Sequence, residues 1–389
     1  MESHADAATA WLSDRARAMQ DALAPLVDIN SFTENAEGGR KVGTLLRELF
    51  AADGVEATSR RSERFADHLV FRSRPAAPNR DAVALVGHLD TVFPPGTFEG
   101  YRRDGALARG PGVLDMKGGL VVIAFALKAL AATGGLDKVV PLRIVVVADE
   151  EVGSPEGQGI ISAAIAGSAA CLVFEAGREA DAIITRRSGT GQMAIVVHGH
   201  AAHAGNGHAQ GANAIWAAAR FVDAAQRLTD YDRGVTVNVG RFSGGESTNT
   251  VPDRAEAHVD LRFRANADAD ALVASIQRAA DEAVASVPRT RVELHGGVLR
   301  RPLERSEASA KLLDEYGACA RAHGLGSAEA PLIGGASDAS TSASLGIPSI
   351  DGLGPRGAGF HTKDERIEIA SLVPKAQALA RFLAGRGAS

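Results

Sequence analysis

Five short motifs along the chain carry histidine or acidic residues, and three of them directly follow apolar runs. Their candidate functional residues are His88, Asp90, Asp115, Glu150, Glu151, Glu175 and His361. Two imidazoles together with several carboxylates form a ligand set that Zn²⁺ prefers, and Mn²⁺ or Co²⁺ can also occupy such a set. The residue types and their order therefore predict a site for divalent metal ions.

The same residues indicate which chemistry such a site would support. A carboxylate shared by two cations can hold them about 3.5–4 Å apart, the separation used when a bridging water hydrolyses a substrate. A further carboxylate must then take a proton from that water and return it to the leaving amine. The adjacent Glu150 and Glu151 could divide these tasks, one as base and one as ligand. Taken alone, a D-E-E run is an ordinary solvated loop, but five motifs in order favour a shared hydrolytic site.

The apolar segments around these motifs indicate how the residues are positioned. Continuous apolar runs at 82–87 and 142–148, rich in β-branched residues, predict strands that are covered on both faces. Segment 118–132 has the length of a buried crossover helix, and 171–174 is another short strand candidate. Because ligand sites of open α/β sheets lie outside the carboxyl ends of the strands, we expect the candidate residues to converge there.

From about residue 188 the pattern changes to partial alternation of apolar and polar residues, which is typical of an antiparallel sheet with one wet face. The predicted strands are 193–198, 235–242 and 255–263, with amphipathic helices near 212–228 and 267–286. The α/β character returns near residue 302 and ends in a helix near 372–384. We therefore predict an α/β catalytic metal-binding domain with a mixed sheet (1–187 and 299–389) and an inserted α+β domain (188–298).

Composition excludes several classes of protein. A chain of 389 residues with 45% hydrophobic and 23% charged residues predicts a globular protein of two domains. The net charge of −5 gives no electrostatic reason to expect nucleic acid or an anionic membrane as a partner. Cys171 and Cys319 are isolated, which suits a reducing compartment. Residues 1–20 lack an apolar core and predict a surface helix, not a signal peptide, so we expect a cytoplasmic protein without a membrane span.

At these motifs the chain resembles the M20 family of metallopeptidases, and within it the glutamate carboxypeptidase (carboxypeptidase G2-like) branch. The matching segments are G-H-L-D-T-V-F-P at 87–94, G-P-G-V-L-D-M-K-G-G at 110–119, D-E-E-V-G-S at 149–154, F-E-A-G at 174–177 and F-H-T at 360–362. The resemblance covers nearly the whole chain. It implies a catalytic domain of the zinc exopeptidase type, interrupted by a lid or dimerisation domain.

The resemblance also assigns roles to the candidate residues. It implies two divalent metal ions, Zn²⁺ with Mn²⁺ or Co²⁺ as alternatives. His88 and Glu175 bind one ion, Glu151 and His361 bind the other, and Asp115 bridges them. Glu150 is then the general base. Asp90 accepts the second ring N–H of His88 and so fixes its tautomer. The family often has a cis peptide after the bridging aspartate, which here is Asp115–Met116.

In the inserted domain, the resemblance implies a homodimer in which His203 reaches the active site of the partner subunit and helps to stabilise the oxyanion. Asn249, in S-T-N-T-V-P, offers a second polar contact. Arg262, in V-D-L-R, can grip a substrate carboxylate with two hydrogen bonds. Arg301 is a further candidate for that task, with Arg300 or a surface role as alternatives.

The resulting prediction is hydrolysis of an amide bond in a small peptide or N-acyl amino acid, with release of a glutamate-like C-terminal residue. Within the same chemistry, an N-acyl-amino-acid amidohydrolase, a deacetylase or a dipeptidase remains an alternative. A serine hydrolase using Ser337 is disfavoured because Ala339 stands where G-x-S-x-G needs its last glycine. The glycine-rich segment 110–119 lacks the G-x-x-x-x-G-K-[ST] phosphate loop. A non-catalytic binding module is disfavoured because every ligand and Glu150 are retained.

Overall fold

The computed structural model describes residues 3–74 and 76–387, and the chain divides into two compact units. The first unit comprises 1–186, 305–333 and 337–389, and the second comprises 187–304 and 334–336. Each unit has its own hydrophobic core. Among the described residues, no helix is both long and apolar enough to cross a membrane.

The first unit is built on a mixed sheet, and its described residues form six strands in the order β1-β2-β6-β3-β7-β14. The strands are β1 (Val55–Arg60), β2 (His68–Ser73), β3 (Val83–His88), β6 (Leu142–Val147), β7 (Ala170–Val173) and β14 (Ser349–Ile350). Strands β6, β3, β7 and β14 are mutually parallel, whereas β1 and β2 join antiparallel. The predicted fold class, with strands at 82–87, 142–148 and 171–174, is confirmed.

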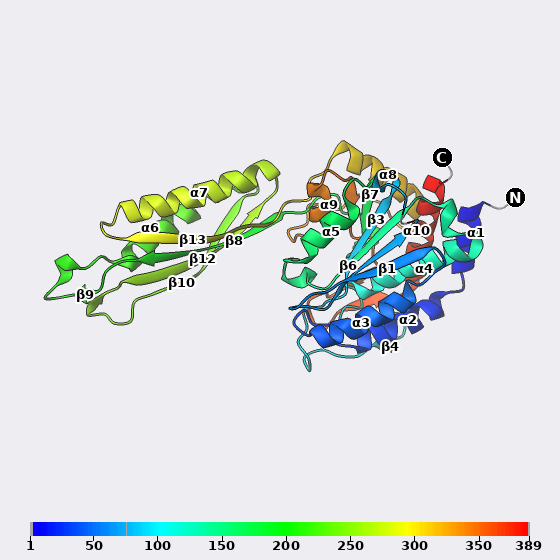
Figure 1. Ribbon diagram of the computed structural model, residues 1–389, viewed down its shortest axis with the longest axis horizontal. Coiled ribbons are helices and arrows are strands. Elements are labelled where there is room, and N and C mark those ends of the chain that lie inside the picture. The colour runs from blue at the N-terminus through cyan, green and yellow to red at the C-terminus, as the bar shows by residue number, and fades with distance from the viewer. Residues whose placement is uncertain (1–2, 75, 388–389) are drawn as a thin grey trace. The chain divides into compact units, whose positions relative to one another are not determined.

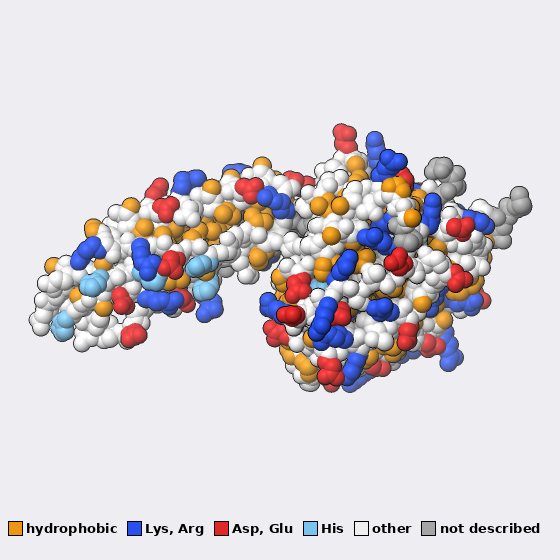
Figure 2. Space-filling model, in the orientation of Figure 1, with side chains coloured by type: hydrophobic (Ala, Val, Ile, Leu, Met, Phe, Trp, Pro, Cys, Tyr) orange, Lys and Arg blue, Asp and Glu red, His pale blue; other side chains and the backbone are white. Residues whose placement is uncertain are grey.

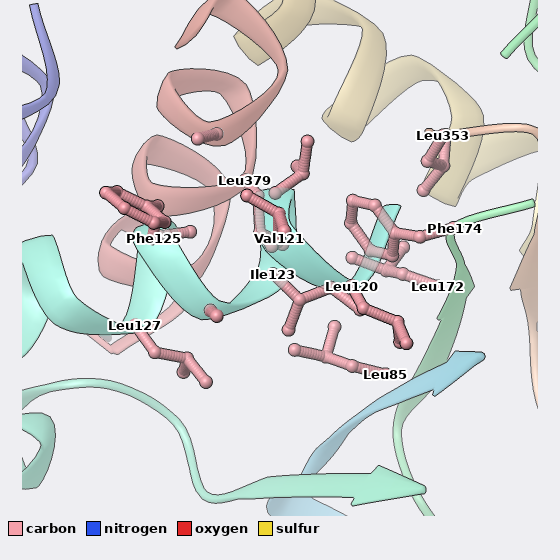
Figure 3. Packing of buried hydrophobic residues seen from close by; sticks show 14 of the residues in the cluster. Leu85, Leu120, Val121, Ile123, Phe125, Leu127, Leu172, Phe174, Leu353 and Leu379 are labelled. Atoms are coloured by element: carbon pink, nitrogen blue, oxygen red, sulfur yellow. The ribbon is translucent and has the colours of Figure 1, made fainter. Parts of the chain in front are cut away.

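Helix α4 (Lys117–Thr133) covers one face of this sheet and explains the continuous apolar runs. Every residue of β3 and β6 is buried, because helices lie on both faces of the sheet. Figure 3 shows Leu120, Ile123 and Leu127 of α4 on the side of the strands, with α10 (Leu372–Gly387) packed on the opposite side. Burial of such side chains is the main favourable contribution to folding.

The remaining elements of the first unit surround this core (Figure 1). They include the helices α1 (His4–Leu12), α2 (Ala16–Asp28), α3 (Ala36–Leu49), α5 (Gly157–Ile165), α8 (Glu307–Arg321) and α9 (Ala339–Ser344). A small antiparallel sheet runs in the order β15-β16-β5-β4, with β15 (Gly357–Ala358), β16 (Arg366–Glu368), β5 (Leu107–Arg109) and β4 (Arg102–Asp104). The sequence suggested one surface helix in residues 1–20, but the described residues 3–20 contribute to two helices, each with one buried side. Ala8 and Leu12 are buried where α1 packs against α4 and α10, and Met19 is buried where α2 packs against α4.

The second unit is an antiparallel sheet, ordered β10-β12-β8-β13, with α6 and α7 on one face (Figure 1). Its elements are β8 (Gly189–His198), β10 (Thr236–Gly244), β12 (Arg254–Phe263), β13 (Arg291–Arg300), α6 (Ala214–Gln226) and α7 (Asn266–Ala285). Burial alternates along β8 and β12, as the sequence pattern predicted. Strand β13 was not predicted, because its edge position leaves only Arg300 buried and glycines interrupt its pattern.

Candidate metal centre

The candidate metal ligands of the first unit come from strand ends and from two loops. His88 is the last residue of β3, and Glu175 lies two residues beyond β7. Glu150 and Glu151 begin a short 3₁₀ turn, η3 (Glu150–Val152), that follows β6. Because β6, β3 and β7 are parallel neighbours, their carboxyl ends lie at one edge of the sheet. Asp115 precedes α4, and His361 lies between β15 and β16.

Asp115 joins the candidate ligands into one cluster, since each of its carboxylate oxygens faces a different histidine. Its Oδ1 lies 3.3 Å from His88 Nε2, and its Oδ2 lies 3.3 Å from His361 Nε2. His361 Nε2 is also 3.1 Å from Glu151 Oε2, and His88 Nε2 is 3.7 Å from Glu175 Oε1. The cluster thus has two halves that share one carboxylate.

These separations fit divalent cations. Four ligand atoms arranged tetrahedrally around a Zn²⁺ ion, at bond lengths of about 2.0–2.1 Å, lie about 3.3–3.4 Å from one another. The separations of 3.1–3.7 Å between the ligand atoms of the cluster bracket this value. The second oxygen of Glu151, Oε1, is buried without a hydrogen-bond partner among the described residues. A buried carboxylate oxygen in this position is suited to face a cation.

The electrostatics of the cluster also favour added positive charge. Burial, reinforced by the nearby Asp115, raises the pKa of Glu175 to about 8. Hydrogen bonds with Asp115 and Glu151 raise the pKa of His361 to about 10. Burial opposes charge on His88, but Glu175 and Asp115 beside it hold the pKa of that ring well above its usual range. Protons on these groups thus offset the negative charge of the crowded carboxylates. A bound metal ion would displace the protons, because histidine binds a metal in its neutral form and a carboxyl group in its ionised form.

Asp90 supports two of the candidate residues through their backbone. Its carboxylate accepts the N–H groups of Glu150 and Glu151, both at 3.2 Å, and the hydroxyl of Thr33 at 2.8 Å. Nδ1 of His88 lies 3.0 Å from the backbone oxygen of Asp90 and 3.4 Å from its carboxylate oxygen Oδ1. The nearer partner of the ring is therefore the carbonyl, whereas the sequence pointed to the carboxylate. Thr33 was not singled out, because a lone threonine far upstream belongs to no recognisable motif.

A close backbone approach brings the Asp115 loop beside the strand that leads to Glu175. A Cβ atom added to Gly119 would lie 2.1 Å from the carbonyl oxygen of Phe174, so only glycine permits this contact. The peptide Asp115–Met116 is cis, as the sequence resemblance implied. The G-G pair of the motif thus has a packing role, and the motif as a whole places Asp115 within reach of both histidines.

In the second unit, His203 and Asn249 lie together. His203 is on β9 (Ala202–His203), which pairs with β11 (Thr250–Val251), and the N–H of Ala204 donates to the backbone oxygen of Asn249 at 2.8 Å. Nδ1 of the exposed His203 ring accepts the N–H groups of Gly205 and Asn206 at 3.0 and 3.1 Å. A neutral ring in this arrangement carries its proton on Nε2, so Nε2 is a hydrogen-bond donor. Figure 2 shows several histidines on the surface of this unit.

The two arginine candidates are each paired with an aspartate of the same unit. Arg262 donates to both carboxylate oxygens of Asp260, at 2.8 and 3.0 Å, and Arg301 donates to Asp270 at 2.9 Å. The β12 end at Arg254 adjoins the β9–β11 pair, whereas Arg262 is near the other end of the strand. At about 3.3 Å per residue, the span from Arg254 to Arg262 is about 26 Å. The unit therefore does not bring the arginines together with His203 and Asn249.

Comparison with known proteins finds a family match for the inserted unit and similarities that extend over nearly the whole chain. Residues 185–288 match the M20 peptidase dimerisation domain. The chain is 28% identical to carboxypeptidase G2 of Pseudomonas sp. (strain RS-16) over 97% of its own length and 91% of that protein. Its fold resembles that of aminopeptidase PepT from Bacillus cereus, with a TM-score of 0.77, 20% identity and coverage of 96% and 99% of the two chains.

A further solved structure is that of the Bacillus subtilis YXEP protein, described as a dinuclear metal-binding peptidase of the M20 family. It has a TM-score of 0.70 and 15% identity, with coverage of 97% of this chain and all of that chain. The match to the dimerisation domain covers most of the second unit, and the full-length similarities cover both units. The chain therefore carries an M20 peptidase dimerisation domain, and along nearly its whole length it resembles carboxypeptidase G2 in sequence and M20 peptidases in fold.

Proposed function

We propose that this M20 hydrolase uses two metal ions to cleave the amide bond of a small peptide or N-acyl amino acid and to release a glutamate-like C-terminal residue. The observation that carries the proposal is the arrangement of Asp115, whose two oxygens lie 3.3 Å from the Nε2 atoms of His88 and His361. The two unpaired thiols, Cys171 and Cys319, suit a reducing compartment and support a cytoplasmic location.

Five side chains would hold the metals, with Asp115 between them. His88 and Glu175 belong to one half of the cluster, and Glu151 and His361 belong to the other. When bound, two divalent cations supply an activated water and polarise the substrate carbonyl. We propose Zn²⁺ as the native metal because imidazole and carboxylate ligands at this spacing suit it, and Mn²⁺ or Co²⁺ are the alternatives.

Glu150 is the proposed general base. Its carboxylate and the ligand atoms of His88 and Glu175 all lie within 4.8 Å of one another, so it borders the cluster. Asp90 holds its backbone N–H at 3.2 Å and thereby fixes the start of the 3₁₀ turn. A carboxylate in this position can take a proton from the attacking water and deliver it to the leaving amine.

Arg262 and Asn249 are the proposed substrate-binding residues, and Arg301 is a further candidate. The released amino acid carries a carboxylate, which an arginine can bind. The planar guanidinium of Arg262 already holds one carboxylate, that of Asp260, through two hydrogen bonds. A substrate carboxylate presents the same geometry and can compete for the same donors. This arginine fits a terminal carboxylate as well as that of a glutamate side chain, and the comparison of glutamate with glutamine substrates tests the acidic preference.

The proposed assembly is a homodimer formed through the inserted unit. His203 and Asn249 are at one end of that unit and Arg262 is near the other, separated along the strand by about 26 Å at the usual rise per residue. One site that uses both groups must therefore take one of them from a second copy. Nε2 of His203, as a donor, can then stabilise the oxyanion of the partner subunit.

A substrate panel with metal add-back tests the proposal. The protein is stripped with a chelator and assayed with N-acyl amino acids and dipeptides after addition of Zn²⁺, Mn²⁺ or Co²⁺. We expect no turnover by the apo protein, restoration by at least one metal, and a preference for substrates with a C-terminal glutamate over the matching glutamine compounds. Activity that remains after treatment with the chelator would contradict the metal mechanism. A preference for N-acetyl substrates, whatever their amino acid, would indicate a deacetylase.

Mixed dimers test whether His203 acts across the subunit interface. His203→Ala and Glu150→Ala homodimers are each expected to be inactive or nearly so, and both should retain their metals. A heterodimer of the two chains contains one intact site if His203 is supplied by the partner, so up to about half the wild-type activity should return per dimer. Mixed dimers that stay as inactive as the parents, despite verified subunit exchange, would show that the histidine serves its own chain or none.

A further inference from the structure

Glu365 is a buried carboxylate that contacts the loop carrying Asp115. Only 1% of its surface is exposed. Its Oε1 accepts the backbone N–H groups of Leu114 and Asp115 at 2.9 and 3.0 Å, and its Oε2 accepts that of Gly112 at 3.1 Å. Three N–H groups of one short loop thus converge on a side chain that is 250 or more residues away in the sequence.

The loop is shaped to present these N–H groups together. Gly112 has φ +75°, and a Cβ added there would lie 2.8 Å from Cγ2 of Thr91 and 3.1 Å from Cδ of Lys117. Successive N–H groups that point into one concavity form an anion-binding arrangement. Here Glu365 supplies the acceptor oxygens from within the protein, and the N–H groups that it satisfies include that of Asp115 itself.

The same short segment also carries His361. Residues 361–365 connect His361 to Glu365, and β16 follows at once and pairs with β5. The N–H of Gly110 donates to the backbone oxygen of Glu365 at 3.4 Å, so main chain and side chain of Glu365 both hold the loop. One segment therefore fixes both members of the contact between His361 Nε2 and Asp115 Oδ2 at 3.3 Å.

We propose that Glu365 is a positioning residue for the metal centre: its carboxylate fixes the Asp115 loop against the segment that bears His361. The inference rests on the proposed metal function of Asp115 and His361. Without the carboxylate, the three N–H groups lose their acceptor and the loop is free to shift. Residues that orient metal ligands in this way typically contribute about 10–100-fold to metal affinity or activity.

Glu365→Gln tests the proposal, with Asp364→Asn as the matched control. The glutamine keeps the size of the side chain but turns one acceptor oxygen into an NH₂ donor that opposes the backbone donors. We expect the metal concentration for half-occupancy, measured by titration calorimetry with Zn²⁺ or Mn²⁺, to rise about 10–100-fold. kcat should fall at limiting metal with KM little changed. Asp364 is an exposed neighbour, and its variant should behave as wild type.

Hydrogen exchange of the metal-free protein provides a readout that does not depend on catalysis. In Glu365→Gln, the amides of Gly112, Leu114 and Asp115 should exchange faster than in wild type, and in Asp364→Asn they should not. Wild-type metal affinity together with unchanged exchange would overturn the inference, as would a lower melting temperature with unchanged metal affinity, which indicates a purely structural role.

Two further outcomes separate this inference from the proposed function. A wild-type protein that binds no metal contradicts the proposed function and, with it, the positioning role, whereas the exchange data still report whether Glu365 holds the loop. If Glu365→Gln does not fold, Glu365→Asp keeps the charge but is one methylene shorter, so it can reach only one side of the loop. A folded aspartate variant with wild-type metal affinity would then overturn the inference.

Discussion

Replacing Glu150 with alanine is expected to abolish turnover while both metal positions stay filled. General acid–base groups contribute about 10²–10⁴-fold to a rate, and Glu150 is proposed both to accept the proton of the water and to return it. Its backbone N–H is held by Asp90, so the 3₁₀ turn should keep its shape when the side chain is removed. kcat on the best substrate of the panel and metal content by elemental analysis are the measurements.

Two companion variants make this result decisive. Glu48→Ala removes an exposed carboxylate of the same unit and should leave kcat unchanged. Glu151→Ala should lose activity together with metal, because its carboxylate lies 3.1 Å from His361 Nε2. If the purified Glu150→Ala variant instead contains no bound metal, Glu150 is a metal ligand and another group must serve as the general base.

Replacing Asp115 with alanine is expected to empty both metal positions, whereas His361→Ala should affect one. The reason is geometric, since Asp115 is the residue that reaches both histidines, each at 3.3 Å. A metal contributes several kcal/mol of transition-state stabilisation, and each 1.4 kcal/mol corresponds to a tenfold change in rate. The Asp115 variant should therefore lose at least about 10³-fold in kcat.

The measurement is the number of metal equivalents bound per chain after dialysis against a defined free metal concentration. Asp14→Ala, which removes an exposed aspartate of the same unit, is the control and should bind as wild type. Retention of one full equivalent by Asp115→Ala, with loss of the other, would argue that the carboxylate serves a single ion and does not bridge.

The strand ends and the residues that follow them were predictable from sequence. The buried parallel strands appear in the sequence as continuous apolar runs, because both faces of the sheet are covered. His88 and the D-E-E run follow these runs immediately. Their convergence with Glu175 follows from the general rule about the carboxyl ends of strands. His361 could not be placed in this way, since its position depends on the small sheet formed by β5 and β16, whose strands have three residues each.

The supporting contacts could not be predicted for a related reason. Glu365 and Thr33 act through hydrogen bonds to segments far away in the sequence, and neither residue type nor spacing reveals such a partner. Strand β13 was not predicted because charged residues and two glycines interrupt the alternation of apolar and polar residues. It forms the edge of the sheet through its pairing with β8. Helix α1 shows the same effect, since its alanine-rich polar sequence predicts a surface position although one of its sides packs on α4 and α10.

The pairing of β16 with β5 has a consequence for the biosynthesis of the molecule. Residues 361–365 must meet a loop translated some 250 residues earlier before Asp115 and His361 can face one another. A growing chain on the ribosome therefore exposes His88, Asp115 and both glutamates of the D-E-E run long before the last histidine exists. The half of the cluster that contains His361 therefore cannot form until the segment that follows β15 has been translated.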